Sequence, residues 1–66
     1  MRLSKRKVEY LLAMKEMSYT DLADKAGTSR QNLCRLFNNA QARPKTIGKI
    51  SNALGVRPEE ILEEEE

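Results

Sequence analysis

The chain has 66 residues, one cysteine and no histidine, and its formal net charge is +2. A chain of this length forms one small domain with one hydrophobic core, and a single cysteine without histidine excludes an internal disulfide and the usual zinc ligand sets. Its basic start, residues 1–7, lacks the apolar run of a signal peptide or membrane span, so we expect a cytoplasmic protein without a membrane segment.

The charge is divided unevenly along the chain. Residues 1–57 hold all 12 basic residues and only four acidic ones, a net charge of +8, whereas the last nine residues hold six glutamates. A basic body is typical of a protein that binds a polyanion, although many small proteins carry such an excess for solubility. We expect a folded domain over residues 1–62 and an acidic tail over residues 63–66 that avoids phosphate.

The first predicted helix is amphipathic and precedes residue 17. Its apolar residues, at helical spacing, are Val8, Leu11, Leu12, Ala13 and Met14. A basic amphipathic helix can also lie on a membrane, but this apolar face is narrow and the other helices need a packing partner. A core helix is therefore favoured.

The segment 18–38 is predicted to form two short capped helices joined by a tight turn. Ser18 and Asp21 have the spacing of a capping box, which indicates a helix start. Gly27 ends that helix because glycine readily adopts the left-handed conformation, and Ser29 offers the next N-cap. The inward positions of the first of these helices are Leu22, Ala23 and Ala26.

A helical wheel gives the second of these helices two different sides. Its inward positions are Leu33, Leu36 and Phe37, and its outward positions are Gln31, Arg35 and Asn38. Gln and Arg have the bidentate geometry that fits adenine and guanine edges in the major groove. Three polar residues alone, however, more commonly mark an ordinary solvated helix face. The surrounding pattern has to decide between these interpretations.

Two further helices are predicted in the last third of the chain. Pro44 suits the first turn of a helix, and Gly55 ends that helix. Its inward positions are Ile47, Ile50, Ser51 and Leu54. Pro58 begins a short fifth helix that carries Ile61 and Leu62 on its apolar side. The expected fold is therefore all-α, with five short helices around one core.

Three segments occur in a characteristic order: MSYTDLA (17–23), GTSRQNL (27–33) and RPKTIGKISNALGV (43–56), the last being the most specific. Their order and spacing resemble the Cro/C1-type helix-turn-helix family, also called the XRE family, over residues 3–62. The resemblance implies a lambda repressor-like fold in which helices 2 and 3 form the helix-turn-helix.

The resemblance also implies two groups of DNA-contacting residues. Those that face base edges are Arg30, Gln31 and Arg35, with Asn32 and Cys34 beside them as additional readers. Those that contact the sugar-phosphate backbone are Tyr19, Ser29, Asn38, Asn39, Arg43, Lys45 and Thr46. Tyr19 stands where the family often has glutamine, and its phenol donates to phosphate without reproducing paired amide contacts.

The chain departs from the family pattern at one pair of positions, and it has a cysteine in the third helix. Many members pair an arginine in the first helix with a glutamate in the third, and the matching residues here are Leu12 and Phe37. Since desolvating an ion pair is costly, an apolar contact is an acceptable replacement, and we predict that Leu12 packs on Phe37. Cys34 has two interpretations, a redox role or a small neutral contact residue.

These features predict a sequence-specific double-stranded DNA-binding transcriptional regulator, repressor-like and of bacterial or phage type, with residues 30–38 in the major groove. We expect no catalysis, no metal and no cofactor, because no nucleophile–base pair or phosphate-cradling loop is evident. Family members commonly bind near-palindromic operators in pairs, which implies a weak homodimer. Candidates for its contact are Ile61, Leu62, Tyr10 and Met14, with the alternative that the same residues complete the small core.

Two alternatives stay open. In the first, the chain is an antitoxin that binds a toxin protein and represses its own operon. In the second, it is a protein-interaction module that keeps the fold without DNA binding. The glutamate-rich end would suit a basic protein partner in the first case. A neighbouring toxin gene or loss of duplex binding at low salt would separate these from a plain regulator.

Overall fold

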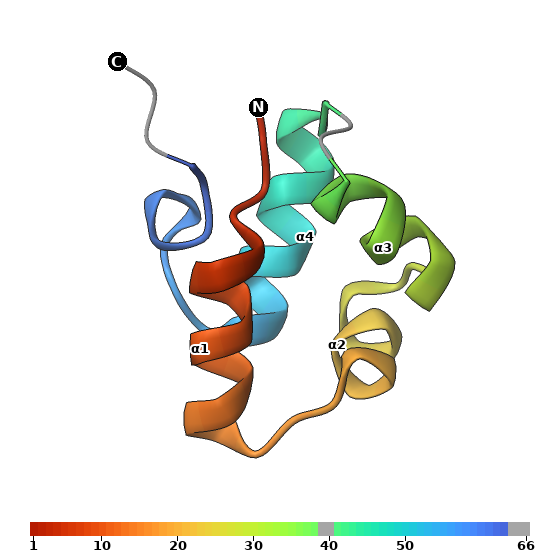
Figure 1. Ribbon diagram of the computed structural model, residues 1–66. Coiled ribbons are helices and arrows are strands. Elements are labelled where there is room, and N and C mark those ends of the chain that lie inside the picture. The colour runs from red at the N-terminus through yellow and green to blue at the C-terminus, as the bar shows by residue number, and fades with distance from the viewer. Residues whose placement is uncertain (39–40, 64–66) are drawn as a thin grey trace.

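The computed structural model describes residues 1–38 and 41–63. Within these residues the helical elements are α1 (Lys5–Lys15), α2 (Tyr19–Ala26), α3 (Arg30–Phe37), α4 (Pro44–Leu54) and the 3-10 turn η1 (Pro58–Glu60). The all-α class is confirmed. Figure 1 shows α2 and α3 on one side of the molecule, with α1 and the C-terminal segment on the other.

The fifth predicted helix is a single 3-10 turn in place of an α-helix. The backbone N–H of Ile61 donates to the carbonyl oxygen of Pro58 over 3.1 Å, three residues earlier. Helical geometry stops there because Leu62 pairs with Leu3 in an antiparallel β-bridge. An extended residue in such a bridge takes no part in a helix.

The predicted ends of α2 and α3 are confirmed by their hydrogen bonds. The Ser18 hydroxyl accepts from the Asp21 N–H at 3.1 Å, and the Asp21 carboxylate accepts from the Ser18 N–H at 3.0 Å. Gly27 ends α2 with a φ of 70° in the left-handed region. The Ser29 hydroxyl then accepts from the Asn32 N–H at 3.0 Å. Only three residues therefore separate the two helices.

Because of the capping box, the stability of the domain should decrease at acidic pH. Hydrogen bonds from the backbone N–H and hydroxyl of Ser18 hold the pKa of Asp21 below its usual value of 3.8. This contribution is present above that value and is lost as the pH falls through the folded-state pKa. We expect Asp21→Asn to flatten the fall of the urea midpoint below about pH 4. An unchanged acid slope would contradict this assignment.

The hydroxyl side of the same box is tested at neutral pH. Ser18→Ala leaves the Asp21 backbone N–H without its hydroxyl acceptor and should cost about 1 kcal/mol of unfolding free energy. Thr20 is exposed in the same turn, and no cap involves its side chain. Thr20→Ala is therefore the matched control, expected to stay within about 0.5 kcal/mol of the parent.

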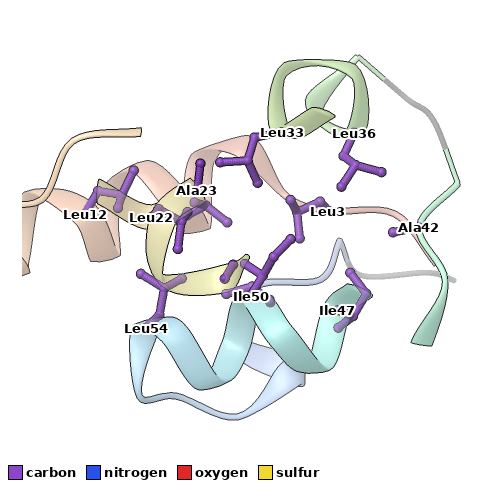
Figure 2. Packing of buried hydrophobic residues seen from close by; sticks show 13 residues of the cluster. Leu3, Leu12, Leu22, Ala23, Leu33, Leu36, Ala42, Ile47, Ile50 and Leu54 are labelled. Carbon is purple, nitrogen blue, oxygen red and sulfur yellow. The ribbon is translucent and has the colours of Figure 1, made fainter. Parts of the chain in front are cut away.

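The hydrophobic core receives side chains from all four helices. The inward positions predicted for α2 and α4 are all buried, which confirms the predicted phase of both helices. In α3, Leu33 and Leu36 are buried and Phe37 is half-buried. Figure 2 shows Leu33 and Leu36 facing Ile47 and Ile50 of α4 across the core. This packing sets which side of α3 points outward.

The apolar face of α1 is narrower than predicted. Val8 and Leu12 are buried and Leu11 is half-buried, whereas Ala13 and Met14 are exposed. Met14 lies two residues after Leu12, which places it about 200° around the helix and away from the core. It therefore belongs to the outer surface of the helix.

One of the residues predicted for the homodimer contact is buried in the core. Ile61 is 0% exposed and completes the core, so it cannot meet a second copy. Ile61 directly follows η1, belongs to the same core cluster as Leu3, and its carbonyl oxygen accepts from the Ser4 N–H. Leu62 is half-buried, while Tyr10 and Met14 are 68% and 65% exposed.

The N-terminal stretch links the C-terminal end to the segment that precedes α4. The Ser4 N–H donates to the Ile61 oxygen at 2.7 Å, and the Ala42 N–H donates to the Met1 oxygen at the same distance. Leu3 is buried between these two links. In Figure 2 its side chain lies among those of α3 and α4. The first four residues are thus part of the folded domain.

Candidate nucleic-acid interface

The outward side of α3 presents the predicted base-reading residues. Because Leu33 and Leu36 anchor the opposite side in the core, Arg30, Gln31 and Arg35 are exposed. Cys34 is a free, exposed cysteine beside them. Figure 1 shows α3 at the edge of the molecule. The structure therefore brings four of the five candidate base readers to one accessible helix side.

Asn32, the fifth candidate, lies differently. It is half-buried, and its Nδ2 donates to the Thr28 hydroxyl at 2.9 Å. Its Oδ1 accepts from Arg35 Nη2 at 2.8 Å. Both ends of the Asn32 amide are therefore used within the protein. Thr28 was not among the predicted site residues; it lies in the turn before α3, four residues before Asn32.

The residues predicted to contact the DNA backbone lie on three elements. Tyr19 starts α2, Ser29 and Asn38 bound α3, and Arg43, Lys45 and Thr46 lie at the start of α4. Arg43, directly before α4, and Lys45 on α4 are exposed, and Thr46 is half-buried. Asn39 lies outside the described residues. The structure thus distributes these candidates around both ends of α3.

The N-termini of α3 and α4 differ in whether their backbone N–H groups are free to bind an anion. The Ser29 hydroxyl already caps α3, so it is occupied by a backbone N–H. In contrast, α4 begins at Pro44 without any side-chain cap hydrogen bond. The first backbone N–H groups of a helix attract anions when no side chain satisfies them. The start of α4, with exposed Arg43 and Lys45, is therefore suited to a phosphate.

Tyr19 is held in place before any ligand arrives. Its hydroxyl donates to Glu9 Oε2 at 2.6 Å, and its ring packs against Phe37 with centroids 5.6 Å apart. Glu9 lies on α1, ten residues earlier, and no local sequence pattern indicated this contact. Phe37 also packs against the core cluster that contains Leu12, but the Leu12–Phe37 contact itself stays a prediction.

The environment of Tyr19 shifts the titration of its phenol. Burial, followed by the hydrogen bond to Glu9 and the charge of Glu9, raises the pKa of Tyr19 from 10.0 to about 12. The folded state therefore favours the neutral phenol. Its contribution to stability is present below pH 10.0, the ordinary pKa, and is lost as the pH rises through about 12.

An absorbance titration of the phenolate tests this assignment. In a Tyr10→Phe background, where Tyr19 is the remaining tyrosine, we expect Glu9→Gln to lower the Tyr19 pKa without restoring its ordinary value, because burial is the larger cause. Asp24→Asn, an exposed acid on α2, is the matched charge control and should leave the pKa unchanged. Equal effects of the two substitutions would show that the hydrogen bond is not responsible.

A concave surface joins these residues beside α3. It has a volume of about 180 Å³, and its lining residues are Lys5, Glu9, Tyr19, Arg30, Cys34, Phe37 and Asn38. Two basic side chains and one carboxylate therefore share this surface, which runs along α3 from Arg30 to Asn38. The carboxylate is the one acid in this lining, and its hydrogen bond to the phenol keeps Tyr19 turned toward α1.

No group of three or more His, Cys, Asp or Glu side chains within residues 1–38 and 41–63 is arranged to hold a metal ion. Over the same residues, no helix combines the length and apolar character needed to cross a membrane. The family model described as Cro/C1-type HTH DNA-binding domain matches residues 7–66. No curated protein and no solved structure matches the chain.

Proposed function

The chain belongs to the family of Cro/C1-type helix-turn-helix DNA-binding domains, and from this premise we propose that it is a sequence-specific transcriptional repressor. In this proposal α3 enters the major groove of duplex DNA, with Arg30, Gln31 and Arg35 against base edges. The protein acts in the cytoplasm of a bacterium or of a phage-infected cell and performs no catalysis.

The observation that carries the proposal is the exposed outward side of α3. Arg30, Gln31 and Arg35 are exposed there on consecutive turns of one helix, and the core packing of Leu33 and Leu36 prevents the helix from turning them inward. An α-helix with such side chains fits the width of the major groove. The net charge of +8 over residues 1–57 supplies attraction to phosphate.

Contacts on both sides of the exposed face of α3, from α4 and from the concave surface, would fix the position of the helix on the duplex. The start of α4 offers Arg43 and Lys45, and the concave surface beside Tyr19, which runs along α3, offers Lys5 and Arg30. Contacts of this kind set register and orientation without reading sequence. We further propose that two copies bind half-sites about one helical turn apart, as a weak homodimer.

Selection of bound sites from a random duplex pool tests this function. We expect the protein to enrich a defined, near-palindromic sequence, and a variant carrying Gln31→Ala and Arg35→Ala to enrich none. Both substituted side chains are exposed, so circular dichroism should show that the variant keeps its fold. Failure of the folded parent to bind duplex DNA even at low salt would overturn the proposal and leave a protein-interaction role.

A further inference from the structure

The side chains of Thr28, Asn32 and Arg35 form a short hydrogen-bonded chain along one side of the turn and α3. Asn32 Nδ2 donates to the Thr28 hydroxyl at 2.9 Å, and Arg35 Nη2 donates to Asn32 Oδ1 at 2.8 Å. The first bond is partly buried, whereas the second is exposed. The amide is thus anchored on the protein side and directed toward the guanidinium on the solvent side.

We propose that Asn32 is a positioning residue that holds Arg35 ready for one guanine, and that it is not itself a base reader. This inference rests on the proposed function of α3. It differs from the role implied by the family resemblance, in which Asn32 reads a base beside Arg35.

The hydrogen-bonding capacity of the amide supports this assignment. An asparagine reads adenine through its carbonyl oxygen and its NH₂ group together. In Asn32 the oxygen is directed to Arg35 and the NH₂ group to Thr28. Turning the amide toward a base would break both bonds and leave a partly buried hydroxyl without its donor. The amide is therefore committed to the protein.

The donors of Arg35 remain sufficient for a guanine. A guanidinium has five N–H donors, four of which form two forks of two, and a guanine needs one fork for its O6 and N7 atoms. Asn32 accepts from Nη2 alone, and each of the two forks uses a different Nη2 hydrogen. One complete fork therefore stays available. The bond to Asn32 restricts the rotation of a long side chain before binding, which reduces the entropy lost when the fork meets the base.

The positioning role predicts where in the operator the effect of Asn32→Ala appears. We expect about a 3- to 10-fold loss of affinity, the effect of freeing one long side chain, confined to sites with guanine at the base pair that Arg35→Ala identifies. In an Arg35→Ala background, Asn32→Ala should cause no further loss. A loss of preference at a different base pair would show that Asn32 reads a base and would overturn the proposal.

Two variants separate positioning from a general structural effect. Asn32→Asp keeps an acceptor for Arg35, so the ratio of affinities for guanine and non-guanine sites should persist, while overall affinity falls because a carboxylate repels phosphate. Asn52→Ala makes the same change at an exposed position of α4 and should leave both quantities unchanged. An equal loss on every sequence by Asn32→Ala would overturn the proposal.

A measurement without DNA keeps this inference distinct from the proposed function. The ¹⁵N relaxation of Arg35 Nε reports the order of its side chain in the free protein. We expect this order to fall in Asn32→Ala and, to a smaller extent, in Thr28→Val, but not in Asn52→Ala. Unchanged order in Asn32→Ala overturns the inference. Absence of duplex binding by the parent, together with the expected relaxation result, would instead overturn the proposed function and leave only the ordering of Arg35 by Asn32.

Discussion

Arg35→Ala is expected to remove the preference for guanine at one base pair of the selected operator, at a cost of about 1–3 kcal/mol for that site. The guanidinium is exposed on the outward side of α3 and keeps a complete donor fork beyond its bond to Asn32. Competition binding with each of the four base pairs at every operator position measures the effect. The loss should concentrate at one position and leave the other preferences in place.

Lys45→Ala is the contrasting control for this experiment. Lys45 is exposed at the start of α4, where we propose a phosphate contact. Its removal should weaken binding to all sequences by a similar factor and lower the slope of log affinity against log salt by about 1. A uniform loss from Arg35→Ala, indistinguishable from that of Lys45→Ala, would contradict the role of Arg35 in sequence recognition.

Leu33→Ala should remove most of the stability of the domain. Leu33 is fully buried and anchors α3 to the core, and truncating a buried leucine typically costs about 2–5 kcal/mol. A domain of this size has a total unfolding free energy of only about 3–10 kcal/mol, at the usual stability per residue. Urea titration followed by circular dichroism should show a greatly lowered midpoint or no folded baseline.

Met14→Ala is the matched control for the core substitution. Met14 is 65% exposed on α1, so its truncation removes few packed atoms and should change the unfolding free energy by no more than about 0.5 kcal/mol. Comparable losses from Leu33→Ala and Met14→Ala would contradict the assignment of Leu33 to the core. Duplex binding by Leu33→Ala should follow its folded fraction, because the residue lies behind the proposed interface.

The elements around the proposed interface were predictable because their signals are local. A capping box at Ser18, a glycine at Gly27 and an N-cap at Ser29 each act within a few residues, and all three were confirmed. The 3.6-residue period then set the inward side of α3, and with it the exposed side. The end of α1 shows the opposite case. Glu16 adopts a φ of 53° there, a conformation that the residue type does not favour and the sequence pattern did not indicate.

The sequence by itself determined the helical class, the bounds and phase of α2, α3 and α4, and the residues that α3 can expose, because periodicity and capping depend on near neighbours. Only the tertiary structure decided that Leu3 and Ile61 belong to the core and that Glu9 holds Tyr19. These contacts join residues far apart in the chain. They depend on how completed helices pack together, and no local pattern records that packing.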